Sequence, residues 1–149
     1  EWHREITQVA PMQMHQIGAT GGGDKAQYSL GFNYIGQQGV FKFTNFERYS
    51  VRANTRFNPV KFLTIGQNVQ VSFNNQLGGS GNPQDLGGGL DFSGEGSPWA
   101  QAYRMVPYIT VTDINGNWGG NGMGASGNGT NPVAQLWRNR NNRFNGFNI

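Results

Sequence analysis

Three stretches of the chain alternate apolar and polar residues with a period of two. In the stretch 26–36, apolar or aromatic side chains occupy the even positions from Tyr28 to Tyr34, and polar residues or glycine lie between them. The stretches 46–57 and 62–75 repeat the pattern, with Gln67 as the violation in the second. Because successive side chains of a strand point to opposite faces, each stretch predicts a two-faced β-strand.

Weaker alternation predicts a strand at 12–20 and another that starts near Asn139 and continues to the end of the sequence. No apolar run is long enough for a membrane-spanning helix. The predicted fold class is therefore all-β, with about five antiparallel strands.

The predicted connections alternate in length. Residues 21–25 and 58–61 form short turns, 37–45 is intermediate, and 76–138 is very long. Short turns at one end and long loops at the other are typical of outer-membrane barrels, whose strands are also long. A soluble β-sandwich alternates in the same way and stays open here, although its solvated faces usually carry more charge than these polar faces do.

The composition also favours a chain with little ordinary water-facing surface. Only 13% of the residues are charged, against about a quarter in typical soluble proteins. The mean hydropathy of −0.57 does not argue against a barrel, because alternating faces average out. The net charge of +3 comes without a long basic run, so nucleic-acid binding has little support.

The sequence contains no recognisable catalytic or metal-binding arrangement, so we expect neither an enzyme nor a cofactor. Asp113, Asn115 and Asn117 resemble the start of a calcium loop. Trp118 and Gly124 stand where such a loop needs glycine and glutamate, which favours a plain hairpin turn. Neither histidine has a partner at ligand spacing, and there is no cysteine. No metal site is predicted.

One predicted strand carries three arginines on the same face. Arg48, Arg52 and Arg56 share a face with Asn54, so in a barrel they would line the lumen or meet a plug domain. Their guanidinium groups would need carboxylate or carbonyl partners from outside this segment. The alternative is a solvated strand face. The opposite, apolar faces are expected to contact lipid, through Tyr28, Leu30, Phe32, Tyr34, Tyr49, Val51, Val69 and Val71.

Several motifs, in order, point to a known family. The most specific is Phe-Glu-Arg-Tyr-Ser-Val-Arg-Ala-Asn at 46–54, supported by Ile-Gly-Gln-Asn at 65–68 and Asn-Pro-Val-Ala at 131–134. Motifs within 2–15 and 21–40 precede them. With this order and spacing, nearly the whole chain resembles SusC/RagA-type TonB-dependent transporters, although 76–96 carries no family signature.

The resemblance implies a barrel of about 22 strands in the bacterial outer membrane, of which this chain supplies about five. It also implies a plug domain that is pulled by the TonB complex, a SusD-like lipoprotein lid, and import of oligosaccharides or peptides. Residues 1–11 would connect plug and barrel, 12–75 would form barrel strands and hairpins, 76–138 would form one long extracellular loop, and 139–149 would begin the next strand. The chain would then be a piece of a longer protein.

Within 76–138 the sequence predicts two small elements. Residues 98–105 favour a short helix, with Ser97 as N-cap and Pro98 in the first position, and 109–117 favour a small hairpin. The aromatic residues of this loop are candidates for contact with the ligand or the lid: Trp99, Tyr103, Tyr108 and Trp118. The alternative is that they only stabilise the loop itself.

Two readings from other classes remain. A secreted carbohydrate-binding β-sandwich could use Trp99, Tyr103 and Trp118 as stacking platforms for sugars. A cell-surface adhesin is the second of these alternatives. Neither reading implies catalysis.

Overall fold

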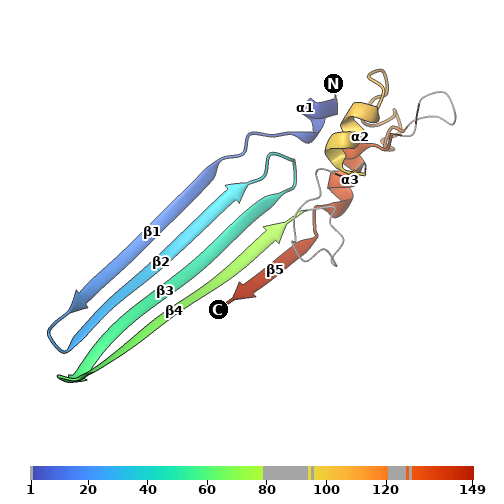
Figure 1. Ribbon diagram of the computed structural model, residues 1–149. Helices are drawn as coiled ribbons and strands as arrows, with labels where there is room; N and C mark the ends of the chain where they lie inside the picture. The colour runs from blue at the N-terminus through green and yellow to red at the C-terminus, as the bar shows by residue number, and fades with distance from the viewer. Residues whose placement is uncertain (1, 79–93, 95, 121–126, 128) are drawn as a thin grey trace. The chain divides into compact units, whose positions relative to one another are not determined.

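The computed structural model describes residues 2–78, 94, 96–120, 127 and 129–149. The described part contains one five-stranded sheet with the strands in sequence order, each antiparallel to its neighbours (Figure 1). No described helix is long and apolar enough to cross a membrane. The elements are α1 (Trp2–Ile6), β1 (Met12–Gly22), β2 (Ala26–Gln38), β3 (Asn45–Val60), β4 (Leu63–Leu77), α2 (Pro98–Arg104), α3 (Pro132–Asn139) and β5 (Arg143–Asn148).

The predicted all-β class is confirmed, and the first four strands lie close to where the alternation places them. The turn between β3 and β4 differs from the predicted turn at 58–61. Pro59 lies inside β3, and the turn contains only residues 61 and 62. The backbone N–H of Asn58 donates to the carbonyl oxygen of Lys25 at 2.8 Å. The backbone N–H groups of neighbouring strand residues point to opposite sides of the strand, so residue 59 would not donate toward β2. The missing N–H of Pro59 therefore removes no hydrogen bond to that strand.

The chain divides into two compact units, which are described separately. The sheet unit consists of residues 11–37, 46–76 and 144–149, and the helical unit consists of residues 1–10, 38–45 and 77–143. The sheet unit holds nearly all of the five strands. The helical unit holds the three helices and the connection between β2 and β3.

The helical unit has a buried apolar core. Its members come from the N-terminal segment, the β2–β3 connection and the long segment after β4: Trp2, Ile6, Phe41, Ala102, Met105 and Leu136. Backbone bonds tie the segments together. Lys42 N donates to the Ile6 oxygen at 2.9 Å, and the Trp2 indole Nε1 donates to the Val106 oxygen at 3.1 Å.

The helix α2 confirms the prediction for 98–105. Pro98 opens it, and the Ser97 hydroxyl oxygen accepts a hydrogen bond from Ala100 N at 3.2 Å. Such a cap satisfies an N–H group that has no partner within the helix. The predicted hairpin at 109–117 is reduced to a turn closed by a single bridge between Thr112 and Trp118.

The helix α3 was not expected, and it corrects the predicted start of the last strand. Asn139 is the final residue of α3, and β5 begins only at Arg143. The helix forms because Asn131 caps it and Pro132 occupies its first turn. The side-chain oxygen of Asn131 accepts from Val133 N and Ala134 N, both at 3.1 Å.

Candidate functional site: the two faces of the sheet

The register of the sheet assigns every strand residue to one of two faces. Tyr34 pairs with His15 across β1 and β2, and its ring lies 5.0 Å from that of Tyr49 on β3. Arg52 on β3 bonds to Gln70 on β4. Residues directly opposite each other in a sheet share a face. The tyrosines therefore mark one face, named here the apolar face, and Arg52 marks the other, named the polar face.

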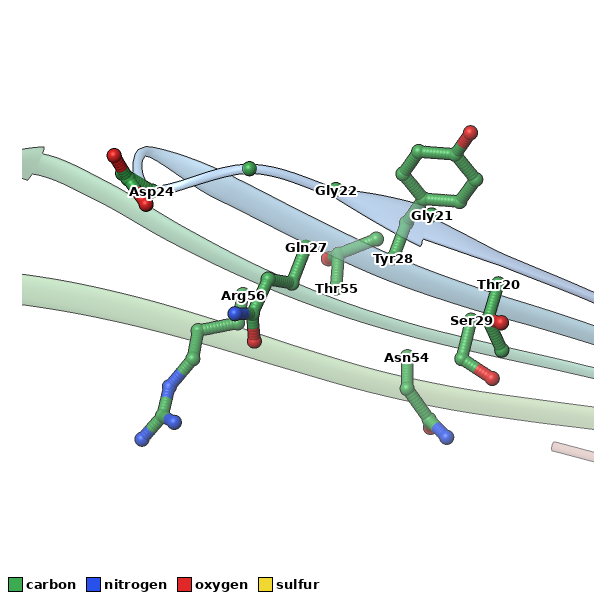
Figure 2. Close-up of a pocket in the computed structure, with 11 residues that line it drawn as sticks. Thr20, Gly21, Gly22, Asp24, Gln27, Tyr28, Ser29, Asn54, Thr55 and Arg56 are labelled. Carbon is green, nitrogen blue, oxygen red and sulfur yellow. The ribbon is translucent and has the colours of Figure 1, made fainter.

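The polar face carries the arginines of β3. Arg48, Arg52 and Arg56 lie at every fourth residue, so all three fall on this face together with Asn54. Figure 2 shows Arg56 and Asn54 extending to one side of the strands and Tyr28 to the other. The structure thus brings together the four residues that were predicted to face a lumen. It also adds Gln70, which sequence reasoning had not singled out.

The Arg52 guanidinium is held in place by its neighbour strand. Its Nη2 donates to Gln70 Oε1 at 2.9 Å, and both side chains are exposed. A guanidinium has five N–H donors, so this bond leaves most of them available. The contact therefore orients Arg52 without using up its capacity to bind a partner.

Two hollows lie on the sheet unit beside these arginines. The larger has a volume of about 660 Å³ and surrounds the β1–β2 turn (Figure 2). It is lined by Thr20, Gly21, Gly22, Gly23, Asp24, Gln27, Tyr28, Ser29, Asn54, Thr55 and Arg56. The smaller, of about 270 Å³, is lined by Gln16, Gly31, Phe32, Asn33, Ser50, Arg52 and Gln70. Each hollow includes one arginine among hydroxyl and amide groups, and the larger also includes the carboxylate of Asp24.

The side chains on the polar face include no carboxylate within the described strands. In β1 to β4 the positions that share this face hold mainly Gln, Asn, Ser, Thr and Gly beside the arginines, with Met12, Met14, Ile35 and Phe46 near one end and Val60 near the other. The acidic residue of β3, Glu47, lies on the apolar face, where its carboxylate accepts from Asn75 Nδ2 at 3.4 Å. The positive charge of the polar face is therefore uncompensated by its own strands.

The apolar face gathers all eight residues predicted to contact lipid. Val51 is 50% exposed, and Tyr28, Leu30, Phe32 and Tyr49 are exposed to a similar extent, while Tyr34, Val69 and Val71 are half-buried. Ile17 of β1, which is 70% exposed, and Ile65 of β4 extend the same face. Ile17 was not among the residues predicted to contact lipid, because the alternation of apolar and polar residues in 12–20 is weak. A soluble sandwich needs a second sheet on such a face, and the described residues form one sheet only.

The aromatic residues predicted as loop contacts fall into two groups within the helical unit. The rings of Trp99 and Tyr103 lie 4.6 and 4.2 Å from that of His3, both edge-on. The ring of Trp118 lies 5.8 Å from that of Trp137. No sequence pattern connects His3 with α2, since contact between distant segments leaves no local signal.

These rings differ in how much surface they present. The guanidinium of Arg140 lies 3.6 Å from the ring centre of Trp137, so that ring is covered by a cation and by Trp118. Tyr103 and Tyr108 remain 69% and 76% exposed. Trp118 and Trp137 are thus packed against each other within the unit, whereas Tyr103 and Tyr108 keep most of their surface exposed.

The Asp113 turn is complete without a metal. The Asp113 carboxylate accepts from the backbone N–H groups of Asn115 and Asn117, each at 2.8 Å, and from Asn117 Nδ2 at 3.0 Å. The side-chain amide of Asn117, followed by these backbone donors, lowers the pKa of Asp113. No cluster of potential metal ligands occurs among the described residues, and Gly124 lies outside them.

Two known proteins resemble most of this chain. No family model matches the chain. TonB-dependent receptor P3 of Formosa agariphila is 27% identical over 124 residues, which cover 83% of this chain and 12% of the receptor. The similarity supports the TonB-dependent receptor family. TonB-dependent receptor P26 of the same organism is 23% identical over 144 residues, which cover 97% of this chain and 13% of that receptor. The chain thus spans about an eighth of the length of these TonB-dependent receptors.

Proposed function

We propose that this chain forms part of the barrel wall of a TonB-dependent importer in the bacterial outer membrane. The observation that carries the proposal is the apolar face of the sheet, where aromatic and aliphatic side chains stay about half exposed. Leaving that surface in water costs about 25 cal/mol per Å². Lipid on one side and an aqueous lumen on the other would satisfy both faces at once. Transport, not catalysis, is the activity that follows.

The orientation in the membrane follows from the connections. The turns at 23–25 and 61–62 leave the same ends of their strands, whereas residues 39–44 and 78–142 leave the opposite ends. Outer-membrane barrels have short periplasmic turns and long extracellular loops. In this proposal the two tight turns are periplasmic and the long segment is extracellular.

We further propose the SusC/RagA type within the family, with a SusD-like lipoprotein as lid and an oligosaccharide or peptide as ligand. The support is the motif at 46–54 together with the motifs that precede and follow it. The TonB complex would act through a plug domain that is not part of this sequence. The exposed Tyr103 and Tyr108, together with Trp99 and Trp118, would contact ligand or lid outside the membrane.

Cysteine labelling of the full-length receptor tests this arrangement. Gly23→Cys, Val60→Cys and Gly120→Cys each place one thiol at a connection, in a chain segment that contains no native cysteine. We expect an impermeant maleimide added to intact cells to label position 120 and to spare positions 23 and 60 until the outer membrane is opened. Labelling of 23 and 60 with 120 protected would reverse the orientation, and equal labelling of all three would contradict membrane insertion.

A further inference from the structure

The arginines of the polar face form an ordered row of charge. Neighbouring members are four residues apart, which corresponds to about 13 Å along a strand. Arg52 and Arg56 are exposed, and Arg48 is half-buried. Arg52 bonds to a neutral amide, and among the described residues none of the three is paired with a carboxylate. Three cations on one face without counter-ions repel one another and attract anions.

The surroundings of the row suit oxyanions. Guanidinium groups bind carboxylate, sulfate and phosphate through paired N–H donors. Arg56 shares its hollow with the hydroxyl groups of Thr20 and Ser29, and Arg52 shares the smaller hollow with Ser50. Gly31 in the smaller hollow leaves room above its strand. The smaller hollow therefore offers one oriented positive charge, neutral hydrogen-bonding groups and space, whereas the larger also contains the carboxylate of Asp24 beside the positive charge of Arg56.

We propose that the solute handled at this face is anionic, a linear oligomer whose units carry carboxylate or other oxyanion groups. The proposal rests on the proposed function, in which the polar face lines the path of the imported nutrient. A row of cations at regular spacing along the strand direction would hold successive anionic groups of one chain. The Gln70 contact makes Arg52 the best-oriented member of the row, because less side-chain freedom is lost on binding.

Binding to the full-length receptor in detergent, measured by calorimetry, tests the proposal. The probes are matched pairs that differ in charge: tetragalacturonate with its carboxyl-reduced neutral form, and tetraglutamate with tetraglutamine. We expect the acidic member of at least one pair to bind about tenfold more tightly than its neutral partner, and the preference to fall at high salt. The pair that shows the preference distinguishes a saccharide from a peptide ligand. Equal affinity within both pairs, including no binding at all, would overturn the proposal.

Substitutions test whether the arginine row causes the preference for the acidic probe. In Arg52→Gln/Arg56→Gln the tenfold preference should disappear, and in Arg52→Lys/Arg56→Lys it should persist in weakened form, since charge remains without the planar pair of donors. Lys61→Gln removes an equal charge from the adjacent turn and should change nothing. A preference that survives in the double glutamine variant would overturn the proposal.

The competing occupant of the row is a set of acidic side chains elsewhere in the same receptor. In that case the glutamine variants would lower the assembled fraction and leave the preference of the remaining receptor unchanged, which overturns the inference. Failure of the proposed function can be distinguished from failure of this inference about an anionic solute. A receptor that imports a neutral nutrient normally in all arginine variants would overturn the inference alone, whereas absence from the outer membrane would overturn the proposed function.

Discussion

In the helical unit, six apolar side chains form a core in which none is more than 9% exposed, whereas on the apolar face of the sheet Ile17 and Val51 are 70% and 50% exposed. The first unit packs these six side chains against one another. The second turns its apolar surface outward and keeps polar side chains on its other face. One chain thus contains a unit with a packed apolar core and a sheet whose apolar face stays exposed, and each should respond to substitution in its own way.

The largest effect is expected at the centre of the helical core. Ile6 is fully buried, so Ile6→Ala leaves a cavity and should cost about 2 to 5 kcal/mol. Hydrogen exchange of α2 and α3 in the full-length receptor should become faster, while exchange in β2 and β3 stays slow. The exposed Val9→Ala serves as the control. Equal acceleration in both regions would show that the two units do not unfold separately.

The next effect concerns the faces of the sheet. Val51→Arg places a charge on the apolar face and should cost about 2 to 4 kcal/mol if that face meets the middle of the membrane. The assembled barrel, measured by its altered mobility in unheated gel samples, should decrease strongly. Arg52→Val changes the adjacent residue on the polar face and should assemble nearly normally. The reverse outcome would exchange the assignments of the two faces.

A smaller effect is expected from the cap of α3. The Asn131 side chain, only 8% exposed, also donates to the carbonyl oxygens of Val111 and Gly119, both at 2.8 Å. Asn131→Ala loses the cap and these bonds and should cost about 1 to 3 kcal/mol. Protease cleavage near residues 111–119 should increase. Asn131→Asp keeps the cap acceptor but not the donor, so its result separates the two contributions.

The smallest effect is expected at the exposed Asp113 turn. The pKa of Asp113 is lowered in the folded state. The ionised carboxylate therefore stabilises the turn at pH values above the ordinary pKa of aspartate. This stabilisation is lost as the pH falls through the lowered pKa. Hydrogen exchange of Asn115 and Asn117, corrected for the intrinsic rate, should rise at acid pH in the native receptor. In Asp113→Ala the exchange rate of these two residues should be raised at every pH. An unchanged pH response in that variant would assign the effect to another group.

The sheet could be predicted from sequence because its signal is local. Each strand carries its own alternation, and the assignment of Val51 and Arg52 to opposite faces needs no knowledge of their neighbours. The bond from Arg52 to Gln70 depends on the register between β3 and β4, which no single strand specifies. The two hollows depend on the same register. They became visible only with the strands in place.

The helical unit was harder to predict because its core has no local pattern. Trp2, Phe41 and Leu136 lie far apart in sequence, and each belongs to a segment too short to show periodicity. The helix α3 did leave a signal, since Asn131 followed by Pro132 is a typical helix start. The Gly- and Asn-rich composition around it favoured a loop, and the capping signal was overlooked.

The origin of that core has a consequence for exchanging loops between related receptors. Ile6, Phe41 and Met105 come from three separate connections and complete one packed cluster. Replacing residues 78–142 alone would set foreign side chains against Trp2 and Phe41, and the graft would leave cavities or overlaps there. A functional chimaera therefore has to transfer residues 1–10, 38–45 and 77–143 as one piece, so natural variation in the three segments should be inherited together.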